Sequence, residues 1–167
     1  MGRSKAGAEL GYRPLDPPWT PALELFGFAG AWAPPDAHIK LGWGAWDGGR
    51  LSGALLLERA GSSAMLHGPV VVAPAEAPLE DALEVAAQLL ADGLGQVEAE
   101  SIETLFARPQ GLDRIWVRYG FIPVPEAELP EPLRGRPGIG LFGRRGGTAL
   151  WSAAGRGRAR PRTAAER

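Results

Sequence analysis

A mixed, mostly antiparallel central sheet flanked by helices, an α/β (α+β) fold, is predicted by three observations on this chain of 167 residues. Strand-like segments separated by glycine-rich turns fill residues 39–73. The apolar residues then change to helical spacing at 79–90. Finally, residues 101–124 have the pattern strand, short helix, strand, with Gly120 ending the helix. Together these patterns predict helices packed on one sheet.

The first strand is expected at residues 10–15, because the prolines that follow cannot donate to a strand ladder. A helix should come next, with Thr20 as its cap and Pro21 in its first turn. The expected buried face has apolar residues at helical spacing: Ala22, Leu25, Phe26 and Ala29. The prolines at 34–35 should end this helix.

Three antiparallel strands in a meander are expected after this helix. Segment 39–46 leads into Asp47-Gly48-Gly49, a strong hairpin signal because glycine tolerates positive φ. The return strand is expected at 51–58. After a turn at 60–63, segment 64–73 carries a valine run that is typical of a strand buried on both faces.

The second half should begin with a long helix. Its expected buried face is made of Leu79, Leu83, Ala86, Ala87 and Leu90. Gly93 and Gly95 are expected to end it, because glycine is common at helix C-termini.

A strand near 99–107 and a strand at 121–124 should enclose a second helix. The apolar residues expected on that helix are Leu112, Ile115, Trp116 and Tyr119. Two further apolar runs, 139–142 and 148–151, should complete a hairpin.

Composition excludes several classes of protein. The 45% hydrophobic and 22% charged fractions are typical of a soluble globular protein. The sequence has no cysteine, which excludes disulfides, thiolate metal sites and a cysteine nucleophile. Its two histidines, His38 and His67, are too few for a histidine metal cluster, so no metal site is predicted.

The sequence has no apolar run of the ~18 residues that a membrane helix needs and no secretion signal, so a cytoplasmic location is expected.

Charge is distributed unevenly along the chain. Residues 152–167 contain five arginines and one glutamate, while the rest has a net charge of about −5. Because this segment is also rich in glycine and alanine, we expect a flexible basic C-terminal tail at 152–167 behind a domain at 8–151. The tail could contact nucleic acid, but the chain has no recognisable nucleic-acid module, so such a partner is not expected.

The order of these elements resembles the GNAT superfamily of N-acetyltransferases, and so do several local phrases. Tyr12-Arg13-Pro14-Leu15 is similar to the family's opening strand, and segment 47–53 is similar to its hairpin. Segment 68–74 is similar to the end of its fourth strand, and Arg118-Tyr119-Gly120-Phe121 is similar to its closing helix-to-strand signature. The resemblance implies transfer of an acetyl group from acetyl-coenzyme A to an amine.

In this family the acyl-coenzyme A lies where the fourth and fifth strands separate, and its diphosphate contacts the N–H groups that open the next helix. The resemblance implies cofactor-binding residues at Val71, Val72, Ala73 and Ala82. The family's loop has a basic or amide residue, then Gly, then Gly or Ala. These three positions fall on Ala77, Glu80 and Ala82 here, and only Ala82 conforms.

The start of this helix is acidic, which is unfavourable for a diphosphate. Pro78 removes one donor, and Glu80 and Asp81 add two carboxylates. At ~6 Å and an effective dielectric of ~20, each unit-charge pair would cost about 2.8 kcal/mol before solvent screening. An alternative explanation is an ordinary helix start, with a proline in the first turn and acidic residues that interact favourably with the helix dipole.

The catalytic positions also depart from the family. Many members have a tyrosine that protonates the departing thiolate, and the resemblance places Trp116 at that position. Tyr119 is the nearest substitute, with a buried structural aromatic as the alternative. Where an asparagine often orients the pantetheine arm, the chain has Arg108-Pro109.

Three residues are candidates for the base that deprotonates the amine: His67, Glu100 and Glu103. A structural histidine and a solvated strand face are the alternatives for them. The catalytic set predicted here is therefore Tyr119, His67 and Glu103.

Two hypotheses follow from these observations. The first is a diverged N-acyltransferase with a degenerate diphosphate loop and an unknown amine substrate. The second is a non-catalytic binding or assembly module with a protein partner, and a homo-oligomer is left open. Trp32, Trp43 and Trp46 would contact the ligand or the partner, unless they simply pack in the core.

Overall fold

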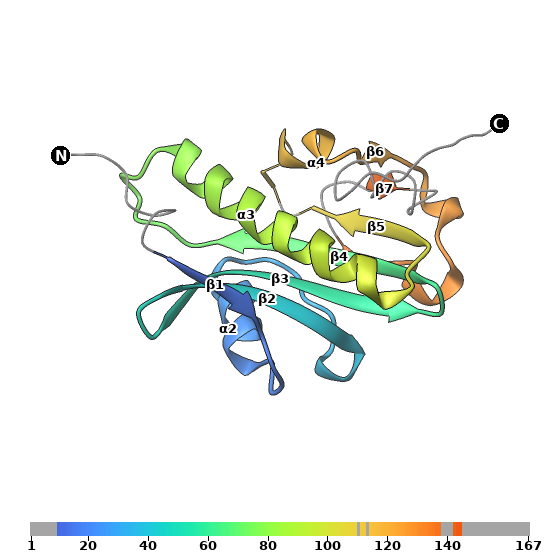
Figure 1. The fold of residues 1–167 in the computed structure, drawn as a ribbon, viewed down its shortest axis with the longest axis horizontal. Coiled ribbons are helices and arrows are strands. Elements are labelled where there is room, and N and C mark those ends of the chain that lie inside the picture. The colour runs from blue at the N-terminus through green and yellow to red at the C-terminus, as the bar shows by residue number, and fades with distance from the viewer. Residues whose placement is uncertain (1–9, 110, 113, 138–141, 145–167) are drawn as a thin grey trace.

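The computed structural model describes residues 10–109, 111–112, 114–137 and 142–144, which form one sheet with helices on both faces (Figure 1). The strand order is β1-β2-β3-β4-β5-β7-β6. The strands are β1 (Gly11–Pro14), β2 (Ile39–Asp47), β3 (Arg50–Ala60), β4 (Ser63–Val71), β5 (Thr104–Arg108), β6 (Ile122–Pro123) and β7 (Phe142–Arg144). Only β4 and β5 pair in parallel, so the prediction of a mixed, mostly antiparallel sheet is confirmed.

The predicted meander is formed by β2, β3 and β4. The β2–β3 hairpin turns at Gly48, whose φ of 63° is a conformation that favours glycine. In β4, every residue from Ala64 to Val70 is buried, as its valine-rich sequence predicts for a central strand. The strand boundaries predicted from the glycine-rich turns therefore lie close to those of the structure.

β4 contains a bulge that changes its direction. The β3–β4 register shifts between Ala54 and Leu56, which places Gly68 and Pro69 opposite a single residue of β3. Gly68 has a φ of 103°, and a Cβ there would lie 3.1 Å from the carbonyl oxygen of Ala54. A side chain would not fit at this position, so the bulge requires glycine.

The helix α3 (Leu79–Val97) covers one face of the sheet and packs on its largest apolar cluster (Figure 1). The prediction that Gly93 and Gly95 end this helix is wrong. Gly93 lies inside the helix against the sheet, where a Cβ would approach Leu55 Cδ2 to 3.0 Å. The lack of a side chain lets the helix pack closely on the sheet, and this burial outweighs the weak helix propensity of glycine. Of the predicted face, Leu79 is exposed instead.

The opposite face is covered in part by α2 (Thr20–Phe28), which buries Ala22, Leu25 and Phe26. Thr20 was expected as the cap, but Trp19 occupies the N-cap position and no side chain caps the helix. This helix ends at Phe28, before the prolines at 34–35. Ala29 follows it as an exposed residue.

The remaining elements are short. They are the helix α4 (Arg114–Arg118) and the 3₁₀ turns η1 (Asp36–His38), η2 (Glu98–Glu100), η3 (Glu126–Glu128) and η4 (Glu131–Leu133). The strand expected near 99–107 begins only at Thr104, because η2 occupies the preceding residues. Of the expected 139–142 and 148–151 hairpin, only Phe142 is described, and it pairs with β5 and β6. Residues 148–151 and the expected tail at 152–167 lie outside the described residues.

Within the described ranges, no helix is long and apolar enough to span a membrane. The same residues contain no group of three or more carboxylate or imidazole side chains placed to hold a metal ion.

Candidate functional site

The point where β4 and β5 separate, here called the fork, is the first feature of the candidate site. The two strands pair in parallel from Ser63 and Thr104 to His67 and Arg108, the last pair in the described residues. β4 nevertheless continues along β3 to Val71. Beyond His67, one edge of β4 is therefore not paired with β5 among the described residues, and an unpaired strand edge can bind an extended ligand.

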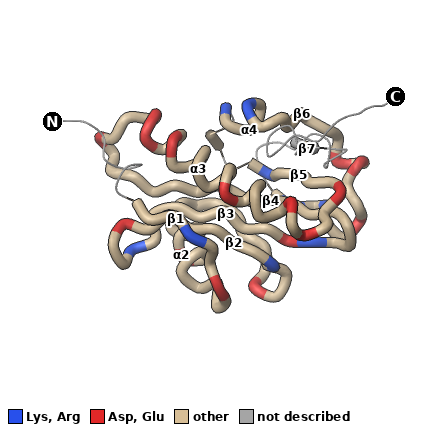
Figure 2. The backbone as a smooth tube through the Cα atoms, in the orientation of Figure 1, with Lys and Arg blue, Asp and Glu red and all other residues tan. Residues whose placement is uncertain are grey.

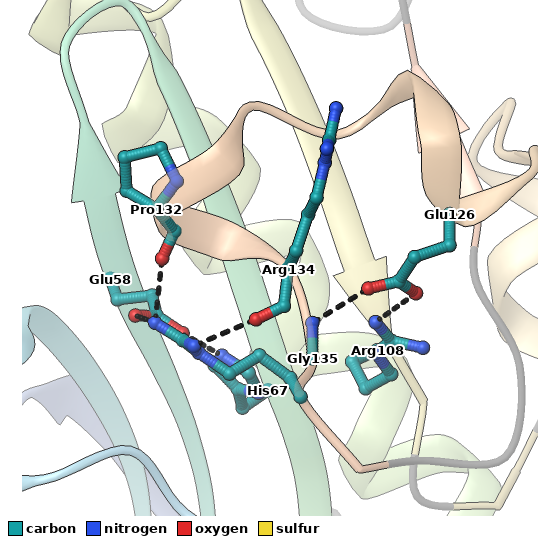
Figure 3. A network of polar contacts seen from close by, with 8 residues as sticks. Glu58, His67, Arg108, Glu126, Pro132, Arg134 and Gly135 are labelled. Atoms are coloured by element: carbon teal, nitrogen blue, oxygen red, sulfur yellow. Dashed lines mark hydrogen bonds and ion pairs between the residues drawn. The ribbon is translucent and has the colours of Figure 1, made fainter.

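A buried polar cluster lies at the fork, on the sheet face opposite α3 (Figure 3). The His67 Nε2 atom lies 2.7 Å from Oε2 of Glu58 on β3. Arg136 donates from Nε and Nη2 to the two oxygens of the same carboxylate, both at 2.9 Å. His67 is 0% exposed and Glu58 is 3% exposed, so this ionic network belongs to the interior. Its paired geometry is what allows a charge to be buried there.

The environment sets the charges of the two groups. Burial by itself would raise the pKa of Glu58, but hydrogen bonds from His67 and Arg136 outweigh it and hold the pKa at about 2. Burial lowers the pKa of His67, against the opposing hydrogen bond with Glu58, and the charges of Arg136 and Arg108 lower it further. At neutral pH, Glu58 is thus a carboxylate and His67 is a neutral imidazole.

Arg108 ends β5 beside His67 and is the second buried basic group. Its Nη2 donates to Glu126 Oε1 at 2.9 Å, and the other oxygen of Glu126 accepts from the Gly135 N–H at 2.7 Å (Figure 3). The Gly135 N–H is the main cause of the lowered pKa of Glu126, followed by Arg108. The Nε atom of Arg108 is buried with no hydrogen-bond partner among the described residues.

Residues 125–137, here called the strap, supply Glu126, Gly135 and Arg136 to this cluster. The strap is held to the sheet by Leu129 and Leu133, which are buried against Met65 and Phe106. Within the strap, Arg134 donates to the carbonyl oxygens of Leu129 and Ala127, and Arg136 donates to those of Pro132 and Arg134. The strap is therefore a packed part of the fold.

Trp32 covers His67 from the loop between α2 and β2. The two ring centroids lie 5.3 Å apart, and the Arg136 guanidinium lies 5.9 Å from the centroid of the Trp32 ring. Trp32 is half-buried, whereas Trp43 is buried in the core and donates to Gln96 Oε1. Of the three tryptophans considered as ligand contacts, Trp32 is therefore the one placed at the fork.

A pocket of about 300 Å³ lies beyond the fork, at the start of α3, and is here called the α3 pocket. Its walls come from the β2–β3 hairpin, the end of β4 and the first turns of α3. The four predicted cofactor-binding residues are together in its lining: Val71, Val72, Ala73 and Ala82. Val71 is also the last residue of β4, so the pocket begins where the strand that forms one side of the fork ends.

The charge of this pocket differs in part from the prediction. Asp81 is buried and lines the pocket, whereas Glu80 is exposed and lies instead on the side facing α4. Pro78 is the N-cap and not a first-turn residue. Figure 2 shows acidic and no basic positions along the first turns of α3. Of the two helix-start carboxylates, only Asp81 therefore lines the pocket; Asp47 of the β2–β3 hairpin adds a second carboxylate, and Arg50 is the single basic residue of the described lining.

No protein-family model matches the chain, and no curated protein sequence does so either. Its structure is similar to that of an acetyltransferase of the GNAT family from Staphylococcus aureus, with a TM-score of 0.59, 11% identity and coverage of 81% of this chain and 98% of that one. It is also similar to the ribosomal-protein-S18-alanine N-acetyltransferase from Escherichia coli. That match has a TM-score of 0.55 and 12% identity, and it covers 80% of this chain and 92% of that one. The chain has the GNAT fold. The predicted resemblance is thereby confirmed at the level of architecture.

A third similar structure carries ligands. It is N-acetylglutamate synthase from Neisseria gonorrhoeae complexed with coenzyme A and N-acetyl-glutamate, with a TM-score of 0.59 and 18% identity. The match covers 82% of this chain but only 35% of the synthase, so this GNAT-fold chain spans about a third of that protein.

The position that the resemblance assigns to a general acid is occupied by a core residue. Trp116 is 0% exposed and packs edge-on against Phe121, with ring centroids 5.0 Å apart. The hydroxyl of Tyr119 donates to the Ala87 carbonyl oxygen at 3.4 Å, which ties α4 to α3. The structure therefore gives Tyr119 a packing role and does not bring it to His67.

The two glutamates considered as bases lie at the other end of β5. Glu103 is exposed and immediately precedes the strand, and Glu100 forms a 4.0 Å ion pair with Arg59. Glu103 lies five positions before Arg108, about 16 Å along an extended strand. In this GNAT-fold chain, only His67 of the predicted catalytic residues lies at the fork.

Three members of the cluster were not predicted from the sequence. They are Glu58, Glu126, and Arg136 as the ion-pair partner of Glu58. A signal for Glu58 was present, because period-two alternation places it on the same strand face as Ala54 and Leu56. A carboxylate on such a face requires a buried partner. No local pattern could identify that partner, because Arg136 is 78 residues further along the chain.

Proposed function

We propose that the chain is an N-acyltransferase that uses an acyl-coenzyme A thioester, such as acetyl-coenzyme A, to acylate an amine. The observation that carries the proposal is that β4 continues past its pairing with β5 and ends at Val71, which lines the α3 pocket. An extended pantetheine arm fits along a strand edge, and the pocket leads from that edge to the start of a helix. The similar synthase structure contains coenzyme A, which supports the same cofactor class here.

The fit is different at the two ends of the cofactor. Val71, Val72 and Ala82 offer apolar contacts for the arm, whereas Asp81 repels the diphosphate and Pro78 lacks an N–H donor. We propose that Arg50, at the pocket lining, supplies the missing positive charge, since its ion pair with Asp47 is long at 3.7 Å and exposed. A bound cofactor would supply an activated acyl carbonyl at the fork.

His67 is the residue proposed to receive the proton of the amine. Glu58 orients the ring through Nε2, which leaves Nδ1 without a partner among the described residues. Acylation forms a C–N bond and breaks the C–S bond, the thiolate leaves with its electron pair, and the amine releases one proton. A neutral imidazole held in one orientation can accept that proton.

A second candidate function is the non-catalytic module, in which the fold is kept for binding. It is favoured by the burial of Trp116 at the general-acid position and by the carboxylate of Asp81 in the pocket. In this case the fork would bind a partner or a small molecule without turnover.

Calorimetric titration with acetyl-coenzyme A, followed by thiol-release assays with a panel of amines, separates the two candidates. Ala77→Phe should block binding, because Ala77 lines the α3 pocket, and Ala75→Phe is the matched control because Ala75 is exposed in the same loop. Binding that Ala77→Phe alone removes, together with turnover, supports the transferase. Specific binding without turnover favours the module, and no binding at millimolar cofactor contradicts the proposed cofactor use.

A further inference from the structure

Two unpartnered polar atoms lie on neighbouring strands at the fork. They are Nδ1 of His67 and Nε of Arg108, each buried without a hydrogen-bond partner among the described residues. His67 is 0% exposed and Arg108 is 7% exposed. The two residues are direct register partners of the parallel β4–β5 pair. Buried polar atoms in folded proteins nearly always have a partner, so two neighbouring exceptions indicate a place for a polar ligand.

The hydrogen-bonding role of Nδ1 follows from Glu58. A carboxylate only accepts hydrogen bonds, so the His67 nitrogen 2.7 Å from it, Nε2, must carry the hydrogen. The ring is neutral, and the second nitrogen therefore presents a lone pair. His67 Nδ1 is an acceptor that lacks a donor.

The role of Arg108 Nε is fixed by its chemistry. A guanidinium carries hydrogen on every nitrogen and has no acceptor. The Nη2 atom of Arg108 is committed to Glu126, while Nε–H has no acceptor in the described structure. The fork thus places an orphan donor with a positive charge beside an orphan acceptor.

We propose that the acceptor substrate is an α-amino acid, whose amino group binds His67 Nδ1 and whose α-carboxylate binds Arg108 Nε. An α-amino acid is a short ligand that has a donor and an anionic acceptor on one carbon, which matches neighbouring strands about 4.8 Å apart. This inference rests on the proposed transferase function for its catalytic meaning, although binding alone can be measured without it. The same contacts place the amine at the base and at the open strand edge.

Access to this pair of atoms runs past two side chains. The Trp32 ring lies tilted against the His67 ring, and Arg136 pairs with Glu58 beside the Trp32 ring. Trp32 is half-buried and the Arg136 side chain is 18% exposed, so both have a surface open to solvent. A ligand reaches these atoms when Trp32 rotates away from His67, while Arg136 stays paired with Glu58 and Leu129 and Leu133 keep the strap on the sheet.

The experiment compares L-amino acids with the amines that lack only the α-carboxylate. The pairs are L-leucine and 3-methylbutylamine, L-phenylalanine and 2-phenylethylamine, L-lysine and 1,5-diaminopentane, and L-glutamate and 4-aminobutyrate. Dissociation constants are measured by calorimetry on the full chain without cofactor, and thiol release is then measured with acetyl-coenzyme A. In at least one pair, the amino acid should bind tenfold or more tightly than its amine, as expected for a hydrogen bond between charged groups.

Arg108→Lys is the decisive variant, because it keeps the charge facing Glu126 but removes the Nε–H group. It should abolish the preference for the carboxylate, while Arg118→Lys on the exposed part of α4 should leave it unchanged. Circular dichroism and urea unfolding establish whether each variant is folded. Should Arg108→Lys not fold, Glu58→Gln serves instead, because it frees the orientation of the His67 ring and should weaken binding of the amino acid.

The outcomes separate this inference from the proposed function. Turnover with equal use of both members of every pair would overturn the amino-acid assignment and leave the transferase intact. Amino-acid binding that depends on Arg108, without any use of acetyl-coenzyme A, would support the subsite and contradict the transferase. If no amino acid binds to the free chain or competes in the thiol-release assay, the assignment is wrong.

Discussion

The His67 Nε2 atom lies 2.7 Å from Glu58 Oε2 inside the sheet–strap interface, where both side chains are buried. The pair joins the middle strands β3 and β4 on the face opposite the largest apolar core. Arg136 completes it from the strap. The same contact thus contributes to stability and orients the one predicted catalytic residue that lies at the fork.

Acidification should destabilise the chain through His67, which faces Glu58, Arg108 and Arg136. Burial lowers its pKa below the ordinary 6.5, so between the two values the unfolded chain binds a proton that the folded chain does not. The free energy of unfolding therefore rises with pH through this window, so the chain should be less stable at pH 5.5 than at pH 7.5. Urea unfolding at both pH values measures it, and His67→Asn should lack this component. An equal pH dependence in both proteins would contradict the assignment.

The contribution of Glu58 to the free energy of unfolding should change at lower pH values than that of His67. Its pKa is about 2 in the folded chain against an ordinary 4.5, so its contribution to the free energy of unfolding is present above pH 4.5 and is lost as the pH falls from 4.5 toward 2.

The coupling between Glu58 and Arg136 can be measured by removing one partner. Arg136→Met should lower the free energy of unfolding by about 3 kcal/mol, because it leaves a buried carboxylate without its guanidinium partner. The double variant with Glu58→Gln should cost less than the sum of the two single variants in a double-mutant cycle. Additive costs would show that the two groups act independently.

Two glycines of α3 offer a matched comparison of packing. Gly95 has open space around its Cβ position, so Gly95→Ala should raise the free energy of unfolding by about 0.8 kcal/mol through helix propensity. Gly93→Ala gains the same propensity but places a methyl group 3.0 Å from Leu55 Cδ2 and 3.4 Å from Trp43. It should therefore be less stable than Gly95→Ala by about 1 kcal/mol or more. Equal stabilisation in urea unfolding would mean that the helix has room to move away from the sheet.

Cofactor affinity should respond to Asp81 and not to Glu80. Asp81→Asn removes the carboxylate that α3 contributes to the lining of the α3 pocket, and we expect acetyl-coenzyme A to bind three- to tenfold more tightly as repulsion is lost. Glu80→Gln removes the same charge one residue away, on the side facing α4, and should change affinity by less than twofold. Each of the two variants should also lower the free energy of unfolding by about 0.3–1 kcal/mol, because each removes a negative charge from the first turn of α3. Identical affinities for the two variants would indicate that the diphosphate is not near this helix start.

The sequence predicted most of the fold because its signals are local. Glycine at 48 fixed the β2–β3 hairpin, and the change of spacing at Leu79 marked the start of α3. The end of α3 could not be predicted, because glycine commonly ends helices and only the contact of Gly93 with Leu55 explains why this helix continues.

The site was less predictable than the fold, for a physical reason. His67 could be named as a candidate, and segment 71–73 could be placed by the end of β4. The partners that define the charge and orientation of His67 are Glu58 and Arg136, and these come together only when the strap packs on the sheet. Such long-range pairing leaves no periodic trace in the sequence.

The strap also affects how the chain can be synthesised and shortened. Because Arg136 closes an ion pair with Glu58 across 78 residues, the middle of the sheet holds an uncompensated charge until nearly the whole described chain has emerged. A fragment that stops before residue 129 would lack both the leucines that seal this face and the guanidinium that neutralises it. We therefore expect the amino-terminal strands alone to be less stable than the chain that includes the strap.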